Sequence, residues 1–456
     1  MTSKFIDLND LQPIKIDKSF DGWLKEDSLA RFIVEIVNQL DISSIEAEYN
    51  TSGSAGYPPR MMIALIFHAY ASGIFSSRKI EKATYELIPA IFITQGLHPD
   101  HSSIANFRKR FIKNLENLFV QILLIASEMG VLKLGSVSLD GTKIKANASK
   151  HKALSYEYAC KLEDKLQQEI IILMAKANES DNTENNDINI PDELRRREDR
   201  LKNIIAAKTT IEQRRKLRHE QEKREYEAKL EERALKEKAK GRKLGGKKPV
   251  APEEKPKPSD QVNLTDEESR IMPVSGGGFQ QAYNAQAAVD MNTMLILENH
   301  VSHNSNDKQE LKPILNKIAQ LPNQLGTVDK AVADNGYKSD TNTMFAAEIG
   351  IELYVPMGRQ KHNNKLDELL FQDPVEPLNP SPSEAMSHRM LTKGGKAFYA
   401  LRKTTIEPTF GIIKEIMGFR RFSLRGFDLV NGEWTLVSIA YNLKRLCTLN
   451  LKLAQN

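Results

Sequence analysis

The chain has 456 residues, of which 40% are hydrophobic and 27% are charged, and its formal net charge is +5. This length predicts two or three domains, and the composition is typical of a globular protein. No run of about 18 apolar residues occurs and the N-terminus lacks a signal-peptide pattern, so we expect no membrane span and no secretion. Cys160 and Cys447 are the only cysteines. This excludes a cysteine-based zinc site and favours a reducing, cytoplasmic location.

The positive charge is concentrated in one segment. From Arg195 to Lys248 there are 21 Lys and Arg residues against 10 Asp and Glu. Such a concentration is typical of nucleic-acid binding. A solvated helix that keeps the protein soluble explains this segment equally well when it is taken alone.

Residues 1–125 predict a series of short helices. Apolar residues recur at helical spacing, Pro58 and Pro59 open one helix, and Asp100 or Ser102 caps another that runs through Leu118. Short helices with tight turns suit a helix-turn-helix-like DNA-binding domain. Its basic groups would be Arg78, Lys79, Arg108, Lys109 and Arg110. A helical packing or dimerisation domain is the alternative.

A second domain is expected to begin with a strand that ends near Asp140 and to comprise residues 126–150 and 259–456. The intervening residues 151–258 have a different character. Helical apolar spacing extends from Leu154 to Ala177, a polar stretch follows, and a returning helix then becomes almost entirely charged. We therefore predict a basic helical hairpin with a flexible linker, inserted after the first strand.

The elements after the insertion alternate between strands and helices. Residues 283–289 and 294–301 predict two strands joined by a hairpin turn at Asp290. Asp307 is expected to cap a helix over 311–318, and the next strand ends at Asp334. A helix over 343–349 and a strand over 351–355 follow.

The C-terminal part begins with a proline-rich stretch. Residues 357–396 predict a long loop, and Glu407 is expected inside one helix from Tyr399 to Met417. A last helix covers residues 434–446. Without the insertion, this order matches an α/β fold with an RNase H-like mixed sheet, in which the first strand is central and the fourth lies beside it. That placement would bring Asp140 and Asp334 together across about 190 residues.

Three acidic residues are candidate metal ligands: Asp140, Asp334 and Glu407. Mg²⁺ prefers carboxylate oxygens, and a pair of Mg²⁺ ions suits in-line displacement at a phosphodiester. Asp140 on the central strand suits the bridging position. The carboxylates repel one another without metal, so at least one pKa should rise. Asp290 also follows an apolar strand and is the strongest rival, but we prefer its interpretation as a turn residue.

Basic residues surround these acids in the sequence. Arg402, Lys403 and Lys414 flank Glu407 on its helix, and Lys143 and Lys145 follow Asp140. We expect them to hold DNA phosphates near the metals, although each one taken alone is better explained as a solvated surface residue. For His300 and His303, beside Asn304, a polar loop is preferred to a metal site.

Several blocks resemble bacterial insertion-sequence DDE transposases. Residues 138–149, with Leu-Asp-Gly-Thr-Lys, are similar to the first catalytic block of that family, and residues 282–290 and 333–337 to the next two. Residues 405–414 and 418–426 resemble the block around the last acid, and residues 434–445 the family's tail. The blocks occur in the family's order, and only the basic insertion lies outside the resemblance.

The resemblance implies a set of site residues. Asp140, Asp334 and Glu407 would hold two Mg²⁺ ions, for which Mn²⁺ is expected to substitute. The family's Tyr-Arg-Glu-Lys signature falls on Tyr399, Arg402, Glu407 and Lys414. Arg402 lies one residue farther from Glu407 than in the simplest form, so Lys403 competes for its role. Further DNA contacts are implied for two residues of the last block, Arg420 and Arg421.

The resemblance also implies a function. The chain would be a DNA transposase that nicks the element's ends by metal-dependent hydrolysis and transfers the freed 3′-hydroxyl into target DNA. Its partners would be double-stranded DNA, in the form of inverted repeats and target, and a second copy of itself in the DNA complex. We expect it in the bacterial cytoplasm, at the nucleoid when it is bound to DNA. The alternatives are a metal-dependent nuclease without strand transfer and an inactive DNA-binding protein derived from a transposase.

Overall fold

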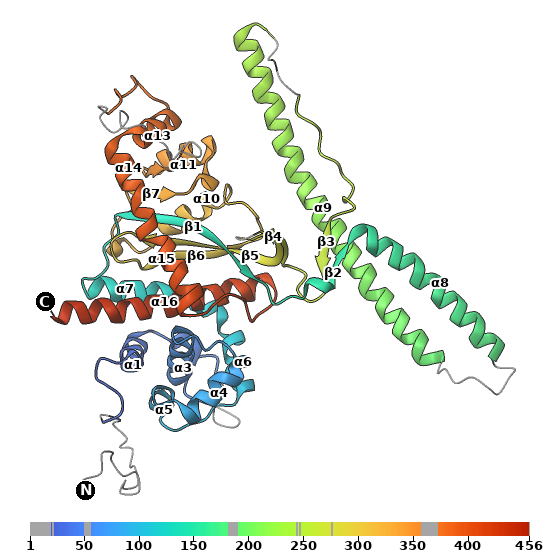
Figure 1. Ribbon diagram of the computed structural model, residues 1–456, viewed down its shortest axis with the longest axis horizontal. Coiled ribbons are helices and arrows are strands. Elements are labelled where there is room, and N and C mark those ends of the chain that lie inside the picture. The colour runs from blue at the N-terminus through green and yellow to red at the C-terminus, as the bar shows by residue number, and fades with distance from the viewer. Residues whose placement is uncertain are drawn as a thin grey trace, which may run out of the picture. The chain divides into compact units, whose positions relative to one another are not determined.

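The computed structural model of the chain describes residues 20, 22–49, 56–180, 190–242, 245, 248–274, 277–356 and 373–455. Two compact units are present. Unit 1 comprises Met1–Ala146, Met272–Ser275 and Ala282–Asn456, and unit 2 comprises Asn147–Ile271 and Gly276–Gln281. Figure 1 shows the helical N-terminal region and the sheet of unit 1, and the long helices of unit 2. None of the described helices is both long enough and apolar enough to cross a membrane.

Short helices form the N-terminal part of unit 1. They are α1 (Leu29–Gln39), α2 (Ser43–Glu46), α3 (Pro59–Ala71), α4 (Ser77–Glu86), α5 (Ile88–Thr94), α6 (His101–Arg110) and α7 (Leu115–Glu128). Asp100 caps α6 by accepting from the backbone N–H groups of Ser102 and Ser103, as its sequence position predicted. The expected continuation of this helix through Leu118 is wrong. The chain turns at Phe111. Apolar side chains are buried on both sides of this turn, so the apolar periodicity of the sequence continues across it and does not reveal the change of direction.

A mixed sheet lies at the centre of unit 1. Its order is β4-β5-β1-β7-β8, and β6 pairs with β5. Strand β1 is antiparallel to β5 and parallel to β7, as the RNase H-like prediction requires. The strands are β1 (Ser136–Lys145), β4 (Arg270–Pro273), β5 (Phe279–Asp290), β6 (Ile296–Ser302), β7 (Lys330–Ala333) and β8 (Glu352–Tyr354).

Helix α16 (Phe427–Gln455) packs against β6 of the sheet and also against α3 and α7 (Figure 1). Polar contacts fix it to the strands, because buried backbone groups need partners. Asn442 bonds both the N–H and the C=O of Ile296 at 2.8 Å, and Trp434 Nε1 donates to the backbone oxygen of Gln286 at 2.9 Å. Helices α10 (Leu311–Ala319) and α11 (Asp340–Glu348) complete the alternation of strands and helices.

Two predictions for the C-terminal part are wrong. Residues 357–372 lie outside the described residues, but the rest of the expected loop contains α13 (Pro382–Leu391) and the start of α14 (Lys393–Ala400). Ser381 and Glu384 form a capping box at α13, where a proline in the first turn is compatible with a helix. The expected single helix around Glu407 is interrupted. It consists of the end of α14, a 3₁₀ turn over Leu401–Thr404, α15 (Ile406–Gly411) and a π-helical turn over Ile412–Ile416.

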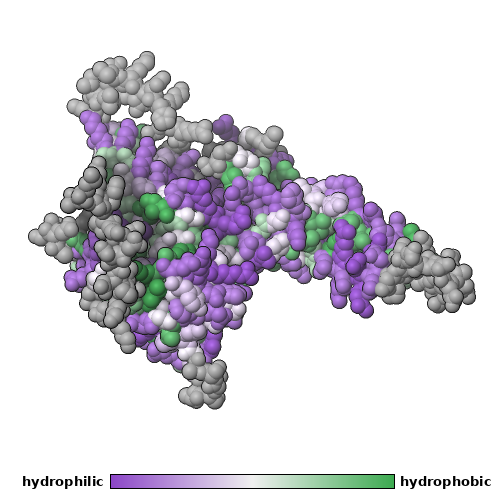
Figure 2. Space-filling view, turned by 60° about the horizontal axis from the view of Figure 1, so that its bottom comes forward, coloured by the Kyte–Doolittle hydropathy of each residue, from purple (hydrophilic) through white to green (hydrophobic). Residues whose placement is uncertain are grey.

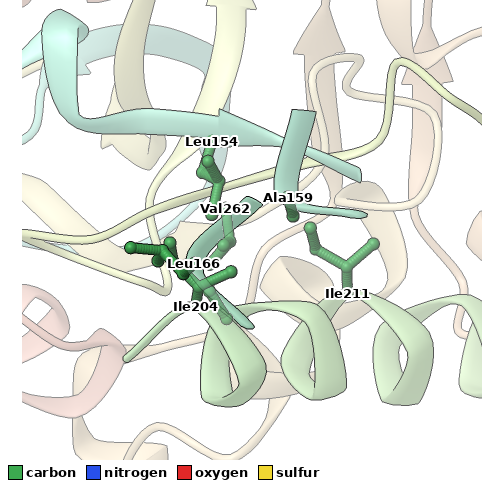
Figure 3. Close-up of a cluster of buried hydrophobic side chains, with 7 residues drawn as sticks. Leu154, Ala159, Leu166, Ile204, Ile211 and Val262 are labelled. Carbon is green, nitrogen blue, oxygen red and sulfur yellow. The ribbon is translucent and has the colours of Figure 1, made fainter. Parts of the chain in front are cut away.

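Unit 2 is a helical hairpin attached to a two-stranded sheet. Strands β2 (Ala153–Ser155) and β3 (Gln261–Asn263) pair antiparallel, and α8 (Tyr156–Ser180) packs against α9 (Ile190–Lys240). Leu154 belongs to β2, so the expected helix begins two residues later than predicted. Figure 3 shows the unit's own core, made by Leu154, Ala159, Leu166, Ile204, Ala207, Ile211 and Val262.

The surface of the chain is predominantly hydrophilic on the face that Figure 2 shows, with apolar patches between the polar ones. On the hairpin, Ile171, Ile172 and Ile205 are exposed apolar residues. The remainder of α9 beyond Leu217 is mostly charged, as the sequence indicates.

Candidate active site

Asp140 and Asp334 lie where two adjacent parallel strands separate. The last residue pair between β1 and β7 joins Leu139 to Ala333, and the two aspartates follow directly. Asp140 Oδ1 accepts from the N–H of Gly141 at 2.9 Å, while β1 continues its pairing with β5. Asp334 Oδ1 accepts from the N–H of Gly336 at 2.7 Å and caps a 3₁₀ turn. Both carboxylates are therefore fixed at the same end of the sheet.

Arg402 connects Asp140 to Glu407. Its Nη2 donates to Asp140 Oδ2 at 2.6 Å and its Nη1 to Glu407 Oε1 at 2.9 Å. The arginine lies on the 3₁₀ turn and the glutamate in the first turn of α15, and the non-helical backbone of Thr405 separates them. This break explains how Arg402 reaches Glu407 despite its longer spacing. The neighbouring Lys403 is exposed.

The electrostatic state of Asp140 reflects its surroundings. Burial raises the pKa of Asp140 to about 6, the guanidinium of Arg402 opposes this, and the negative charges of Asp334 and Asp307 add to it. The predicted rise of at least one pKa is confirmed, but repulsion between the acids contributes less than burial. A cation near this carboxylate stabilises its charged form, and Arg402 supplies one.

Two lysines of the predicted set are partly buried beside the acids. Lys414 donates to Thr142 Oγ1, and Lys143 Nζ lies 3.7 Å from Asp307 Oδ1. Burial lowers the pKa of both ammonium groups, while the charge of Asp140 raises it. Their side chains therefore lie within the electrostatic field of the acidic group.

The remaining predicted cations are exposed along the end of β1. The N–H of Lys145 donates to the backbone oxygen of Arg420 at 3.3 Å, and Lys145 forms an isolated parallel bridge with Arg421. All three side chains are exposed. Arg420 also pairs with Glu415. Lys145, Arg420 and Arg421 thus form a basic strip at the far end of the strand that carries Asp140.

Asp307 was missed by the analysis of the sequence. The expectation that it caps a helix is wrong, because α10 begins after Glu310, and the Asp307 side chain accepts instead from two amides of β5. Asn284 Nδ2 and Gln286 Nε2 both donate to its Oδ1 at 2.7 Å. The available signal was the pair of alternate amides within residues 282–289, which are otherwise Ala, Tyr and Val, since buried amides require partners.

Asp290 and His300, which were not preferred as metal ligands, bind neighbouring protein groups instead. Asp290 Oδ2 accepts from the N–H groups of Asn292 and Thr293 and from the hydroxyl of Thr293. The preferred interpretation of Asp290 as a turn residue is confirmed. His300 Nε2 lies 2.8 Å from Glu310 Oε2.

The described donors around Asp140 have the chemistry that divalent cations prefer, although they are not yet spaced around one ion in this structure. Carboxylate oxygens are the ligands that Mg²⁺ and Mn²⁺ prefer, and the buried Asn284 Oδ1 close to this group has no hydrogen-bond partner in the structure. Over the described residues, no group of three or more acidic, His or Cys side chains is spaced to hold a metal ion. In this arrangement Arg402 provides the positive charge between Asp140 and Glu407.

Two family models match parts of the chain. A model described as the transposase DDE domain matches residues 254–443, which include Asp334 and Glu407 but not Asp140. A second model, a transposase domain (DUF772), matches residues 18–110 in the helical N-terminal region. No curated protein and no solved structure matches the chain. With two transposase models in sequence order and a mixed sheet of the expected topology, this chain belongs to the insertion-sequence DDE transposases.

Proposed function

We propose that this transposase cuts the ends of its element by metal-dependent hydrolysis and then joins them to target DNA. In the first step, a water oxygen bonds to phosphorus and the bond to the 3′-oxygen breaks, which leaves a 3′-hydroxyl and a 5′-phosphate. In the second step, that 3′-oxygen bonds to a target phosphorus. The target's own 3′-oxygen leaves and receives a proton.

Asp140, Asp334 and Glu407 are the residues that would hold two Mg²⁺ ions, with Mn²⁺ as a substitute. When bound, these ions activate the attacking oxygen and neutralise charge on the leaving oxygen. The observation that carries this proposal is the convergence of two strand-end aspartates with a helix-borne glutamate that Arg402 ties to Asp140. Each carboxylate is attached to a strand end or to a helix, which suits a reaction that depends on the positions of the reacting groups.

The basic residues of the site would hold the DNA backbone. Phosphate contacts position a duplex without reading its sequence, which suits a centre that acts on any target. Lys143, Arg402 and Lys414 lie among the acids, and Lys403, Lys145, Arg420 and Arg421 are exposed.

Residues 1–125 would form the domain that recognises the inverted repeats. Arg78, Lys79 and Lys109 are exposed on α4 and α6. Arg108 does not serve this purpose, because its guanidinium is buried and donates to Tyr70 and Phe75. Both ends must be held during joining, so we propose at least a dimer on DNA, with residues 126–150 and 259–456 as its catalytic domain and 151–258 as an insertion.

The test uses purified full-length chain, labelled DNA that carries the element's ends, and a target plasmid, with Mg²⁺ or with EDTA. We expect cut ends and joined product with Mg²⁺ only. Asp140→Asn, Asp334→Ala and Glu407→Gln should each abolish both products.

Glu415→Gln is the matched control for Glu407→Gln, because Glu415 is an exposed acid eight positions along the same segment. It should retain both products. Cutting without joining would identify a nuclease instead. Retained cleavage in Asp140→Asn would refute the assignment of the acids.

A further inference from the structure

Asp307 occupies a position between the two strand-end aspartates. A β-carbon at Gly141, the residue after Asp140, would lie 2.5 Å from Asp307 Oδ1. A β-carbon at Gly336, two residues after Asp334, would lie 3.4 Å from Asp307 Oδ2. The carboxylate of Asp307 therefore spans the gap between the backbone segments that carry the two acids.

Only one of its two oxygens has a donor among the contacts of the described residues. Asn284, Gln286 and Lys143 all approach Oδ1, at 2.7, 2.7 and 3.7 Å. Tyr337 in turn donates to Gln286 Oε1, so the anchoring amide is itself held from the turn that follows Asp334. This arrangement leaves Oδ2 on the side of Gly336 and Asp334.

Asp307 pairs with Lys143 through Oδ1, which leaves Oδ2 for a second cation. The side chain of Asp307 is only 16% exposed. The Lys143 Nζ to Asp307 Oδ1 distance of 3.7 Å is long for a charge-assisted hydrogen bond. Asn284 Oδ1, 2.9 Å from the same β-carbon position at Gly141, is a second oxygen acceptor without a donor in the structure. Oxygen acceptors gathered in a buried place are typical of a site for a hard cation.

We propose that Asp307 is a fourth acidic residue of the metal-binding group, which offers Oδ2 to a divalent cation while Oδ1 is anchored by Asn284, Gln286 and Lys143. This inference rests on the proposed function. It adds a ligand that lies outside the aspartate–aspartate–glutamate set, and it assigns the buried amides of β5 to the positioning of that ligand.

The test measures Mn²⁺ binding to the DNA-free full-length chain by the electron paramagnetic resonance signal of free Mn²⁺. Asp307→Asn keeps an acceptor at Oδ1 and removes the charge. We expect it to weaken Mn²⁺ binding by at least about tenfold, a typical loss for altered metal sites. Its melting temperature in EDTA should be unchanged or higher, because a like charge has been removed beside Asp140 and Asp334.

Glu310→Gln is the matched control. Glu310 is a buried acid three residues away whose carboxylate contacts His300, Ser302 and Asn304, and its variant should retain Mn²⁺ binding. Unchanged Mn²⁺ affinity in Asp307→Asn, with or without a lower melting temperature in EDTA, would overturn the proposal in favour of a structural role.

Two further variants keep the outcome clear. Asp140→Asn should also weaken Mn²⁺ binding, and if it does not, the proposed metal site itself fails, independently of Asp307. Should Asp307→Asn not fold, Asp307→Cys replaces it. A shift of preference from Mn²⁺ to the thiophilic Cd²⁺ in that variant supports direct ligation, and no shift contradicts it.

Discussion

Arg402 supplies the positive charge that stabilises the carboxylates of Asp140 and Glu407 when no metal is bound. Its side chain is only 14% exposed, and its guanidinium donates to both Asp140 and Glu407. Charge-assisted bonds of this kind are stronger than neutral ones, and their removal leaves a buried carboxylate without its partner. If Asp140 and Glu407 bind a divalent cation as proposed, Arg402 competes with it for the same carboxylates.

Arg402→Gln is expected to change stability in opposite directions with and without metal. In EDTA the free energy of unfolding should fall by about 2 kcal/mol, because Asp140 loses its guanidinium partner. With excess Mn²⁺ the variant should gain more in melting temperature than the wild type gains, since a competitor has been removed. Thermal melts in the two buffers measure both effects.

Lys403→Gln is the control for this experiment, because Lys403 is the adjacent exposed cation. It should behave as the wild type in both buffers. Equal responses of the two variants would show that Arg402 has no special place in the acidic group.

Single residues were predictable from the sequence where their partners are local. Asp290 bonds residues two and three positions ahead, and such a turn can be read from sequence. Asp307 bonds amides more than 20 positions earlier, on another strand. Its position ahead of a helix is equally typical of a cap, so no local pattern separates the two outcomes.

Helix α3 contains a buried histidine that makes the folding stability depend on pH. It packs against α1 and α16, and its His68 is 7% exposed. Burial lowers the pKa of His68 to about 4, and the charge of Lys444 adds to this. The histidine is therefore neutral in the folded chain over a range in which the unfolded chain binds a proton.

Acidification should destabilise the chain through His68. The unfolded pKa is about 6.5, so this contribution is complete above that value and is lost as the pH falls towards the folded pKa. Between about pH 7 and about pH 5 the loss should be roughly 2 kcal/mol. The difference between the wild type and His68→Gln in denaturant unfolding at both pH values measures it, because Asp140, with its pKa raised to about 6, titrates in the same range with the opposite sign. The loss should disappear in His68→Gln and persist in His151→Gln, where the histidine is exposed; an unaltered pH dependence in His68→Gln would exclude His68 as its source.

Elements were predictable where periodicity and length agree, as for α3 and β5. The last helix was predicted over residues 434–446 only, whereas α16 extends over Phe427–Gln455. The segment around Glu407 was not predictable, because its apolar spacing continues across Thr405 although the backbone does not. The loop expected before it contained a recognisable start signal, Ser381 followed by Pro382 and Glu384. The neighbouring prolines concealed that signal, although proline in a first turn favours a helix.

At the scale of the whole molecule, the hairpin unit has a core of its own. Ile204 on α9 is 2% exposed within that core, whereas the adjacent Ile205 is 42% exposed. Ile204→Ala should destabilise unit 2 by about 2–4 kcal/mol, as truncations of buried apolar residues do. Amide hydrogen exchange should accelerate in α8 and α9 and remain unchanged in β1, β5 and β7.

Ile205→Ala makes the same chemical change one position later. Because this side chain is already exposed, exchange should change little anywhere in the chain. If Ile204→Ala accelerated exchange equally in the strands of unit 1, the two units would not be energetically separate.

The topology was predictable because the order of strands and helices has few compact solutions. Once the basic insertion is set aside, the sequence pattern indicates a central β1 with β7 beside it, and this is what brings Asp140 and Asp334 together. The role of the insertion was not predictable in the same way. Its charged helix is compatible with DNA or with a second copy of the chain, and neither leaves a distinct pattern of residues.

The acidic and basic side chains around Asp140 nearly balance one another in the protein without metal or DNA. Four acids and three bases lie in this group, namely Asp140, Asp307, Asp334, Glu407, Lys143, Arg402 and Lys414. Their formal charges nearly cancel. If these acids bind magnesium as proposed, the sheet can form before the metal binds, because the three basic side chains already balance most of the acidic charge.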